Sequence, residues 1–140
     1  MSEKARIRVL LVEDDDSDVL FFERALRTHG APVDLEIARD GEEAVQALSR
    51  KEGRPLPDRV LLDLKLPRRS GLEVLAWIRS TPGLRDLPVT IMTSSGEPSD
   101  LQRIKQLGID EYIVKPVSYQ VLLEIVGTLL AKWELSRTGP

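Results

Sequence analysis

The sequence lacks cysteine and contains a single histidine, which excludes several kinds of catalytic and metal-binding chemistry. Without cysteine the chain can form no disulfide, no thiolate zinc site and no thiol nucleophile, and a cytoplasmic location is the simplest expectation. One histidine, His29, cannot by itself build a histidine metal site or a Ser-His-Asp triad. It lies where a helix is predicted to end, which indicates an exposed or capping side chain.

Long apolar runs and an excess of positive charge are also absent. No segment approaches the roughly 18 to 20 apolar residues that a membrane span needs, and the charged segment 1–8 does not resemble a signal peptide. The formal net charge is −3 and the pI is near 5.3, so there is no general electrostatic attraction to nucleic acid or anionic lipid. We therefore expect neither nucleic acid nor a membrane as a direct partner.

What is present fits one globular domain. The chain has 140 residues, of which 41% are apolar and 31% charged, as in proteins with a packed core. Apolar periodicity alternates between strand and helix. Strands are predicted at residues 7–12, 33–38, 59–63, 88–93 and 111–114, and helices at about 17–28, 42–48, 70–80, 98–108 and 119–135. This alternation predicts an α/β fold with a doubly wound parallel sheet and helices on both faces.

Polar residues that could take part in catalysis or metal binding follow four of the predicted strands. They are Glu13 and Asp14, Asp63, Thr93 with Ser94, and Lys115. In open parallel sheets such residues gather at the carboxyl edge of the sheet. Clustered carboxylates repel one another unless a cation compensates, and oxygen ligands suit a hard cation such as Mg²⁺. A nucleophilic carboxylate, a metal, a lysine and a hydroxyl are the parts that phosphoryl transfer to a carboxylate requires.

Each of these residues also has a structural interpretation. Five of the six residues from 13 to 18 are acidic, and a helix dipole favours acids at its N-terminus. That explains Asp16 and Asp18, but it does not explain Glu13 and Asp14 at a strand end. Asp63 alone would be a cap and Lys115-Pro116 an ordinary loop, so the joint arrangement is what indicates a functional site.

Four motifs surround these residues in the sequence. They are Leu-Leu-Val-Glu13-Asp14, Pro57-Asp-Arg-Val-Leu-Leu-Asp63-Leu-Lys-Leu-Pro67, Pro88-Val-Thr-Ile-Met-Thr93-Ser94 and Tyr112-Ile-Val-Lys115-Pro116. Together they resemble the receiver domain of the two-component response regulator family, over about Ile7 to Leu130. The resemblance implies a flavodoxin-like, CheY-like sheet of five strands in the order 2-1-3-4-5, a core of about 7–130 within one domain of 1–140, and no output domain.

The resemblance also assigns roles at the site. Asp63 would be the phosphoacceptor, and Mg²⁺ or Mn²⁺ would be held by Asp14, by Asp63, by the backbone carbonyl of Lys65 and, through water, by Glu13. The Lys65 side chain could shield the acyl phosphate or pair with the acids when they are unphosphorylated, and the sequence does not decide between these.

Four further expectations concern the switch. Lys115 would bind the phosphoryl group, and the Lys115–Pro116 bond would be cis, which X-Pro bonds tolerate best. Thr93 would donate its hydroxyl to a phosphoryl oxygen, and Tyr112 would turn inward on activation. Ser94 suits a position where the family prefers a small residue.

By this resemblance the chain is a single-domain response regulator and not an enzyme, beyond slow self-dephosphorylation. Its partner would be a sensor histidine kinase, and its output would be a protein–protein contact, with a homodimer through the last helices. The opening Val-Glu-Asp-Asp-Asp-Ser-Asp-Val, the loop before Pro57 and the Thr-Ser-Ser stretch resemble stand-alone receivers paired with bacterial phytochrome kinases.

Three other classes of protein share part of this pattern. A haloacid-dehalogenase-like phosphatase requires a second Asp at the position of Lys65. A flavodoxin-like cofactor binder requires a Gly- and hydroxyl-rich loop after the first strand, where this chain has acids. A receiver-fold binding module that does not use phosphorylation is the third, and the set Glu13, Asp14, Asp63, Thr93 and Lys115 argues against it.

Overall fold

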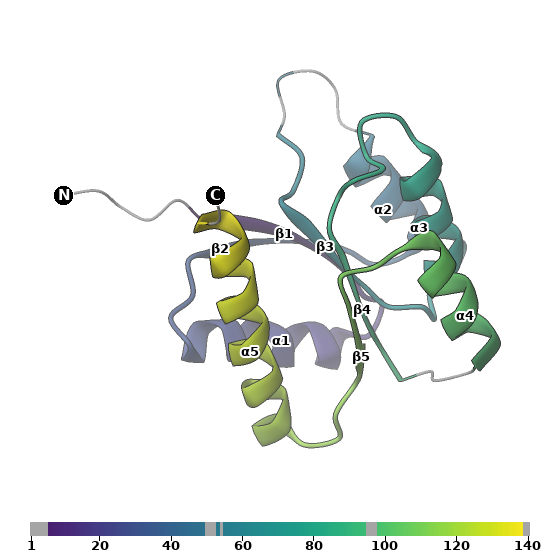
Figure 1. The fold of residues 1–140 in the computed structure, drawn as a ribbon. Helices are drawn as coiled ribbons and strands as arrows, with labels where there is room; N and C mark the ends of the chain where they lie inside the picture. Colours follow the sequence, from purple (N-terminus) through teal and green to yellow (C-terminus); the bar gives the residue numbers. More distant parts are fainter. Residues whose placement is uncertain (1–5, 50–52, 54, 95–97, 139–140) are drawn as a thin grey trace.

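The computed structural model describes residues 6–49, 53, 55–94 and 98–138. In this part of the chain five parallel strands form one sheet in the order β2-β1-β3-β4-β5 (Figure 1). This confirms the predicted fold class and strand order. The strands are β1 (Ile7–Val12), β2 (Val33–Ala38), β3 (Arg59–Leu62), β4 (Val89–Thr93) and β5 (Glu111–Val114).

Five helices alternate with the strands, and their ends lie close to the predicted ones. They are α1 (Asp16–Thr28), α2 (Gly41–Leu48), α3 (Gly71–Ser80), α4 (Pro98–Leu107) and α5 (Tyr119–Thr138). The last helix runs three residues beyond its predicted end. The loop predicted over 50–57 is described at residues 53 and 55–57, and its other residues lie outside the description, as does the last Ser of the Thr-Ser-Ser stretch.

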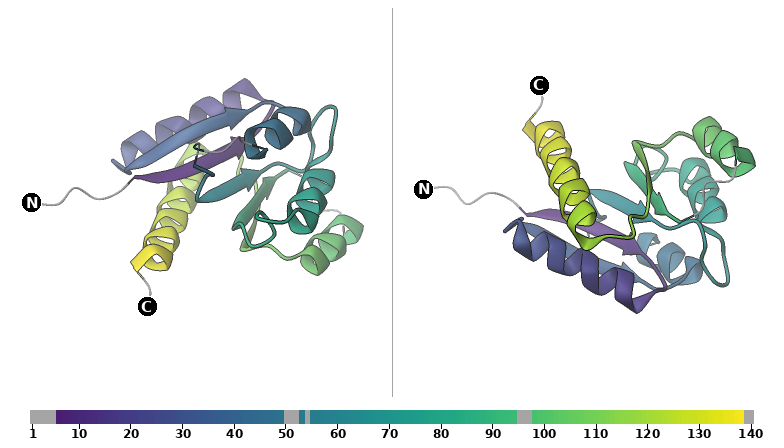
Figure 2. Two further views of the ribbon diagram at one scale, coloured as in Figure 1. Left: turned by 90° about the horizontal axis from the view of Figure 1, so that it is seen from above. Right: turned by 90° about the horizontal axis from the view of Figure 1, so that it is seen from below.

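The helices cover both faces of the sheet, with α1 and α5 on one side and α2, α3 and α4 on the other (Figure 2). The interior strand β1 contributes to both layers, because successive side chains of a strand point to opposite faces. Val9 and Leu11 pack with α1 and α5, whereas Leu10 and Val12 pack with α2 and α3. This explains the continuous apolar run of β1, which is typical of a parallel strand buried on both faces.

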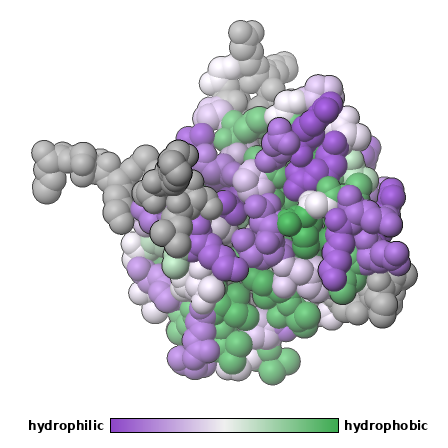
Figure 3. Space-filling view, in the orientation of Figure 1, coloured by the Kyte–Doolittle hydropathy of each residue, from purple (hydrophilic) through white to green (hydrophobic). Residues whose placement is uncertain are grey.

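Apolar side chains also reach the surface. Figure 3 shows them gathered over the lower part of the molecule in that view, where α5 begins and its preceding loop lies. The large apolar residues that are exposed in the described chain are Leu20, Phe21, Val114, Val117 and Val121. No described helix combines the length and the apolar character that crossing a bilayer requires.

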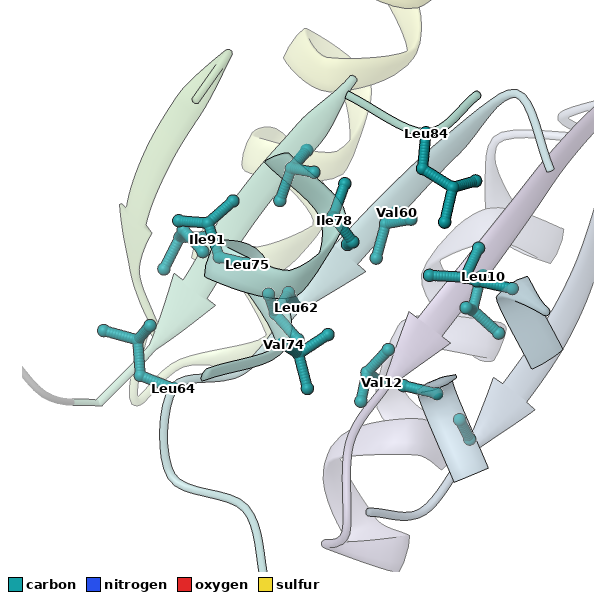
Figure 4. Packing of buried hydrophobic residues seen from close by; sticks show 14 of the residues in the cluster. Leu10, Val12, Val60, Leu62, Leu64, Val74, Leu75, Ile78, Leu84 and Ile91 are labelled. Atoms are coloured by element: carbon teal, nitrogen blue, oxygen red, sulfur yellow. The ribbon is translucent and has the colours of Figure 1, made fainter. Parts of the chain in front are cut away.

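The core on the α3 side fixes the third strand and the helix that follows the candidate acceptor (Figure 4). Val60 and Leu62 of β3 are buried against Val74, Leu75 and Ile78 of α3. Burying side chains of this size contributes about 1.5–3 kcal/mol each. The carboxyl end of β3 is therefore held in place by packing and not by the loop alone.

Helix α3 begins as the sequence predicted. The Ser70 Oγ accepts a hydrogen bond from the Glu73 backbone N–H at 3.1 Å, which is the N-cap bond of the predicted capping box. The Gly71 N–H donates to the Leu64 carbonyl at 2.9 Å, so the helix start is tied to the end of β3. These two contacts set the short loop that carries Asp63 and Lys65.

Candidate functional site

Three carboxylates meet at the carboxyl edge of the sheet, as the strand-end pattern predicted. Glu13 and Asp14 follow β1 and Asp63 follows β3, and each offers an oxygen within 4.8 Å of the others. Glu13 and Asp63 are 4% and 5% exposed, whereas Asp14 is exposed. The Asp63 N–H donates to the Val12 carbonyl at 3.1 Å, and the Glu13 N–H donates to the Ala38 carbonyl at 2.9 Å, so ladder hydrogen bonds extend past the strands to place both acids.

Lys115 supplies the positive charge among these acids. Its Nζ lies 2.7 Å from Glu13 Oε1, 2.8 Å from Asp63 Oδ2 and 2.8 Å from Asp18 Oδ2. The side chain is only 16% exposed, so one ammonium group neutralises part of a mostly buried cluster. Such a charge is retained in a protein interior because it is paired and hydrogen-bonded.

The pKa values of the cluster reflect this balance. Burial alone lowers the Lys115 pKa, but hydrogen bonds to Asp18, Asp63 and Glu13 outweigh burial and raise the pKa above its ordinary value. Burial raises the Glu13 pKa to about 7; the Asp63 charge adds to the rise and the Lys115 hydrogen bond opposes it. Burial therefore destabilises the ionised form of Glu13, and a second cation at the site would stabilise that form.

A pH prediction follows for Glu13→Gln. The folded pKa is about 7 and the ordinary value is 4.5, so between these pH values the folded chain binds more protons and its stability falls as pH rises. Gln cannot ionise. We expect Glu13→Gln to match the wild type near pH 5 and to exceed its free energy of unfolding at pH 8 by up to about 3 kcal/mol in EDTA.

Urea unfolding of both proteins at pH 5 and pH 8 measures this difference. Glu124→Gln, which changes an exposed acid on α5, is the matched control and should follow the wild type at both pH values. A Glu13→Gln variant that is less stable than the wild type at pH 8 would show that the ion pair with Lys115 outweighs the cost of burial.

Asp63 is also held by its own loop. Its Oδ1 accepts the Lys65 backbone N–H at 3.1 Å, while its Oδ2 contacts Lys115. The Lys65 side chain is exposed and forms no ion pair within the described part of the chain. The Lys65 side chain was expected either to shield an acyl phosphate or to pair with the acids. In this structure Lys115, and not Lys65, pairs with the acids.

The two residues expected to respond to a phosphoryl group are joined through their backbones. The Lys115 N–H donates to the Thr93 carbonyl at 2.8 Å, which extends the pairing of β4 with β5. Thr93 is fully buried. Tyr112 lies opposite Ile91 on the same strand pair, and its ring is half-buried against the core on the α4 side. The arrangement connects the site to α4 through β4 and β5.

The expected cis bond at Lys115–Pro116 is wrong for this structure, in which the bond is trans. For an X-Pro bond the two forms differ by about 0.5–1 kcal/mol, so the surrounding structure decides and the dipeptide does not. The trans bond coexists with the three Lys115 ion pairs, so the placement of the ammonium does not depend on a cis peptide.

The sequence interpretation missed Asp18. Its charge was ascribed to the helix dipole, yet its carboxylate is one of the three that hold Lys115. The signal that could have found it is its place in the first turn of α1, next to the strand end that carries Glu13 and Asp14. An acid there lies on the sheet edge where the other acids gather.

A cavity of about 330 Å³ opens beside the acids, between α1 and the loop before α5. One wall is polar and the other apolar. The polar wall consists of Glu13, Asp18, Asp63 and Lys115, and the apolar wall includes Phe21, Phe22, Pro116, Val117, Tyr119 and Leu122. The Asp63 carboxylate therefore faces a cavity whose lining is partly apolar.

The fold and the acidic site at the sheet edge are those of a receiver domain, and the comparison with known families agrees. The model of the response regulator receiver domain matches residues 9–127. The chain belongs to the response regulator receiver family, as its motifs predicted. This membership favours the receiver interpretation over the phosphatase and flavodoxin-like alternatives.

Individual relatives of similar length are regulatory proteins. The chain is 34% identical over 135 residues to the response regulator Rcp1 of Synechocystis sp., covering 94% of this chain and 92% of that protein. It is 37% identical over 127 residues to the probable methanogenesis regulatory protein FilR2 of Methanothrix harundinacea, covering 89% and 82%. The resemblance to phytochrome-paired receivers is confirmed by the solved structure of a phytochrome response regulator.

Solved structures give the same result. The phosphorylated cyanobacterial phytochrome response regulator RcpA superimposes with a TM-score of 0.86 at 33% identity, covering 94% of this chain and 96% of that one. The Mn²⁺-bound form of Rcp1 superimposes with a TM-score of 0.83 at 33% identity, covering 91% and 94%. The three carboxylates fit a divalent cation as well, because hard oxygen ligands in a group are what such an ion prefers.

Proposed function

We propose that this protein is a single-domain response regulator whose Asp63 accepts a phosphoryl group from a sensor histidine kinase in a reaction that needs Mg²⁺ or Mn²⁺. The observation that carries the proposal is the meeting of Glu13, Asp14, Asp63 and Lys115 at one edge of the sheet. Membership of the receiver family supports it. The similarity to a solved phytochrome response regulator favours a phytochrome-like kinase as the donor.

In the proposed reaction an Asp63 carboxylate oxygen attacks the phosphorus of a phosphohistidine. The new P–O bond forms as the P–N bond breaks, and the electron pair returns to the histidine nitrogen, which takes up a proton. A lysine cation beside the acceptor stabilises the charge on the transferring group. Lys115, already 2.8 Å from Asp63, is placed for that task.

The cation would be held by Asp14, Asp63 and the Lys65 backbone carbonyl, with Glu13 acting through water. When bound, it supplies positive charge that neutralises the acids and the phosphoryl oxygens. The charge balance of the site supports this, because the single Lys115 ammonium contacts three carboxylates and Glu13 has a raised pKa. Mg²⁺ is the preferred ion here because it commonly binds through one or two carboxylates plus phosphate oxygens.

Phosphorylation would add about −1.5 to −2 charge at Asp63. The Thr93 hydroxyl and Lys115 would move toward the new oxygens, and Tyr112 would turn inward in response. The backbone hydrogen bond from Lys115 to Thr93 supports such joint movement. On this proposal the protein is a phosphoacceptor rather than an enzyme, with at most slow self-dephosphorylation, and it works in the cytoplasm where kinases use ATP.

We place the receiver core at about 7–130 and the output at a protein–protein contact, with a homodimer through α5 as one form of it. Exposed Val117, in the loop before α5, and exposed Val121, in its first turn, support a contact surface there. Size-exclusion chromatography with and without beryllofluoride would report a change of oligomeric state.

The test of the proposal is intact-mass spectrometry after incubation with acetyl phosphate and Mg²⁺. We expect one phosphoryl adduct on the wild type, and none on Asp63→Asn or in EDTA. Asp58→Asn, which changes a carboxylate at the opposite end of β3, is the matched control and should still be phosphorylated. No adduct on the wild type, together with no binding of beryllofluoride, would favour a receiver-fold module that does not use phosphorylation.

A further inference from the structure

Asp18 holds the Lys115 ammonium from outside the group of acids that fits a metal ion. That group comprises Glu13, Asp14 and Asp63, whose oxygens lie within 4.8 Å of one another. Asp18 comes from α1 and is not part of it, yet its Oδ2 lies 2.8 Å from Lys115 Nζ. Lys115 thus touches two acids of the metal group and one acid beyond it.

A divalent cation and Lys115 compete for the same carboxylates. In this structure the ammonium group contacts Glu13 Oε1 and Asp63 Oδ2 directly. A cation bound among these acids repels the ammonium, and the repulsion is strong because both groups are largely shielded from water. Lys115 therefore has to give up at least part of its contact with Glu13 and Asp63 when the ion enters.

Asp18 offers Lys115 a partner that it can keep. The Lys115 backbone is fixed by the hydrogen bond to the Thr93 carbonyl, and the Asp18 backbone N–H is fixed by the Asp15 Oδ1 at 3.0 Å. The ammonium is then tied between the sheet and α1. The Asp18 side chain is 40% exposed, so it carries its charge at less cost than Glu13.

We propose that Asp18 is a positioning residue for Lys115: it keeps the ammonium on the α1 side of the site, so that Glu13 and Asp63 can take a divalent cation while Lys115 stays beside the acceptor. The inference rests on the proposed function, since it explains how one site accommodates both the metal and the lysine. It extends the functional site to α1.

The test is direct measurement of Mn²⁺ binding to the full chain by electron paramagnetic resonance of free Mn²⁺. We expect Asp18→Asn to raise the Mn²⁺ Kd about tenfold, because Lys115 then stays on the metal ligands. Asp16→Asn removes the same charge from the same helix turn, but Asp16 pairs with Arg39 instead of Lys115. That control should raise the Kd no more than about twofold.

A second comparison isolates Lys115 as the cause. In a Lys115→Met background we expect Asp18→Asn to change the Kd no more than about twofold, because the competing ammonium is gone. Equal effects of Asp18→Asn and Asp16→Asn would overturn the inference, and so would a tenfold effect of Asp18→Asn that persists without Lys115. Circular dichroism of each variant checks that it folds.

The measurement uses no phosphodonor, so its outcome is separate from that of the proposed function. A wild type that binds Mn²⁺ with the expected contrast between Asp18→Asn and Asp16→Asn supports the positioning role, even if no phosphoryl adduct forms on Asp63. A wild type that binds no Mn²⁺ at all would overturn both proposals.

Discussion

Gly71→Ala should destabilise the protein by about 3 kcal/mol and slow phosphorylation of Asp63. A Cβ on Gly71 would lie 2.1 Å from the Asp63 carbonyl oxygen and 2.6 Å from the Leu64 Cα. Both are backbone atoms of the segment that carries the acceptor, so neither can turn aside as a flexible side chain could. The helix start and the end of β3 have to move apart.

The displacement would reach the acceptor itself. The Gly71 N–H donates to the Leu64 carbonyl, and the Lys65 N–H donates to Asp63 Oδ1, so the same short loop makes both contacts. A misplacement of this loop changes the orientation of the carboxylate and of the Lys65 carbonyl. Positioning errors of this kind reduce the rates of reactions that depend on a fixed geometry.

Urea unfolding and the rate of adduct formation with acetyl phosphate measure the two effects. Gly83→Ala is the matched control: its φ is +87°, and a Cβ there meets nothing within 4 Å, so only the conformational cost of about 1 kcal/mol applies. Phosphorylation of that control should proceed at the wild-type rate. If Gly71→Ala and Gly83→Ala are equally stable, the close approach to Asp63 is not a constraint.

The fold could be predicted from the sequence because it depends on periodic patterns. The buried run of β1 and the capping box of Ser70 and Glu73 are local signals, and the structure bears out both. The meeting of Glu13, Asp14 and Asp63 followed from one topological rule, that parallel strands bring their carboxyl ends to one edge. None of these inferences needed the position of a particular side chain atom.

The parts that could not be predicted depend on how elements far apart in the sequence pack together. Asp18 and Lys115 are 97 residues apart, and their contact requires the orientation of α1 against the β5 end. The close approach of Gly71 to Asp63 likewise follows from the packing of α3, since the sequence marks this glycine only as part of a capping box. The cis and trans forms of the Lys115–Pro116 bond differ by too little energy for the local sequence to determine which one is adopted.

The largest electrostatic effect is expected from Lys115→Met. Met keeps much of the length and the apolar part of the side chain, and removes the charge. Glu13 and Asp63, which are 4% and 5% exposed, would then lack their cation. Breaking a buried ion pair by removing one partner costs about 3–5 kcal/mol, and protonation of Glu13 limits the loss at low pH. We expect a loss of about 3 kcal/mol in the free energy of unfolding at pH 8 in EDTA.

A divalent cation should reverse this loss, because it supplies the missing positive charge to the same carboxylates. In saturating Mg²⁺ we expect Lys115→Met to regain most of the wild-type stability, and its metal affinity to exceed that of the wild type because no ammonium competes. Lys105→Met, which removes an exposed charge on α4, should change stability by less than about 0.5 kcal/mol under both conditions. Urea unfolding of the wild type and both variants, in EDTA and in Mg²⁺, gives the stability difference of each variant from the wild type under each condition. A Lys115→Met variant that Mg²⁺ fails to stabilise would separate Lys115 from the metal site and contradict the competition on which the role of Asp18 depends.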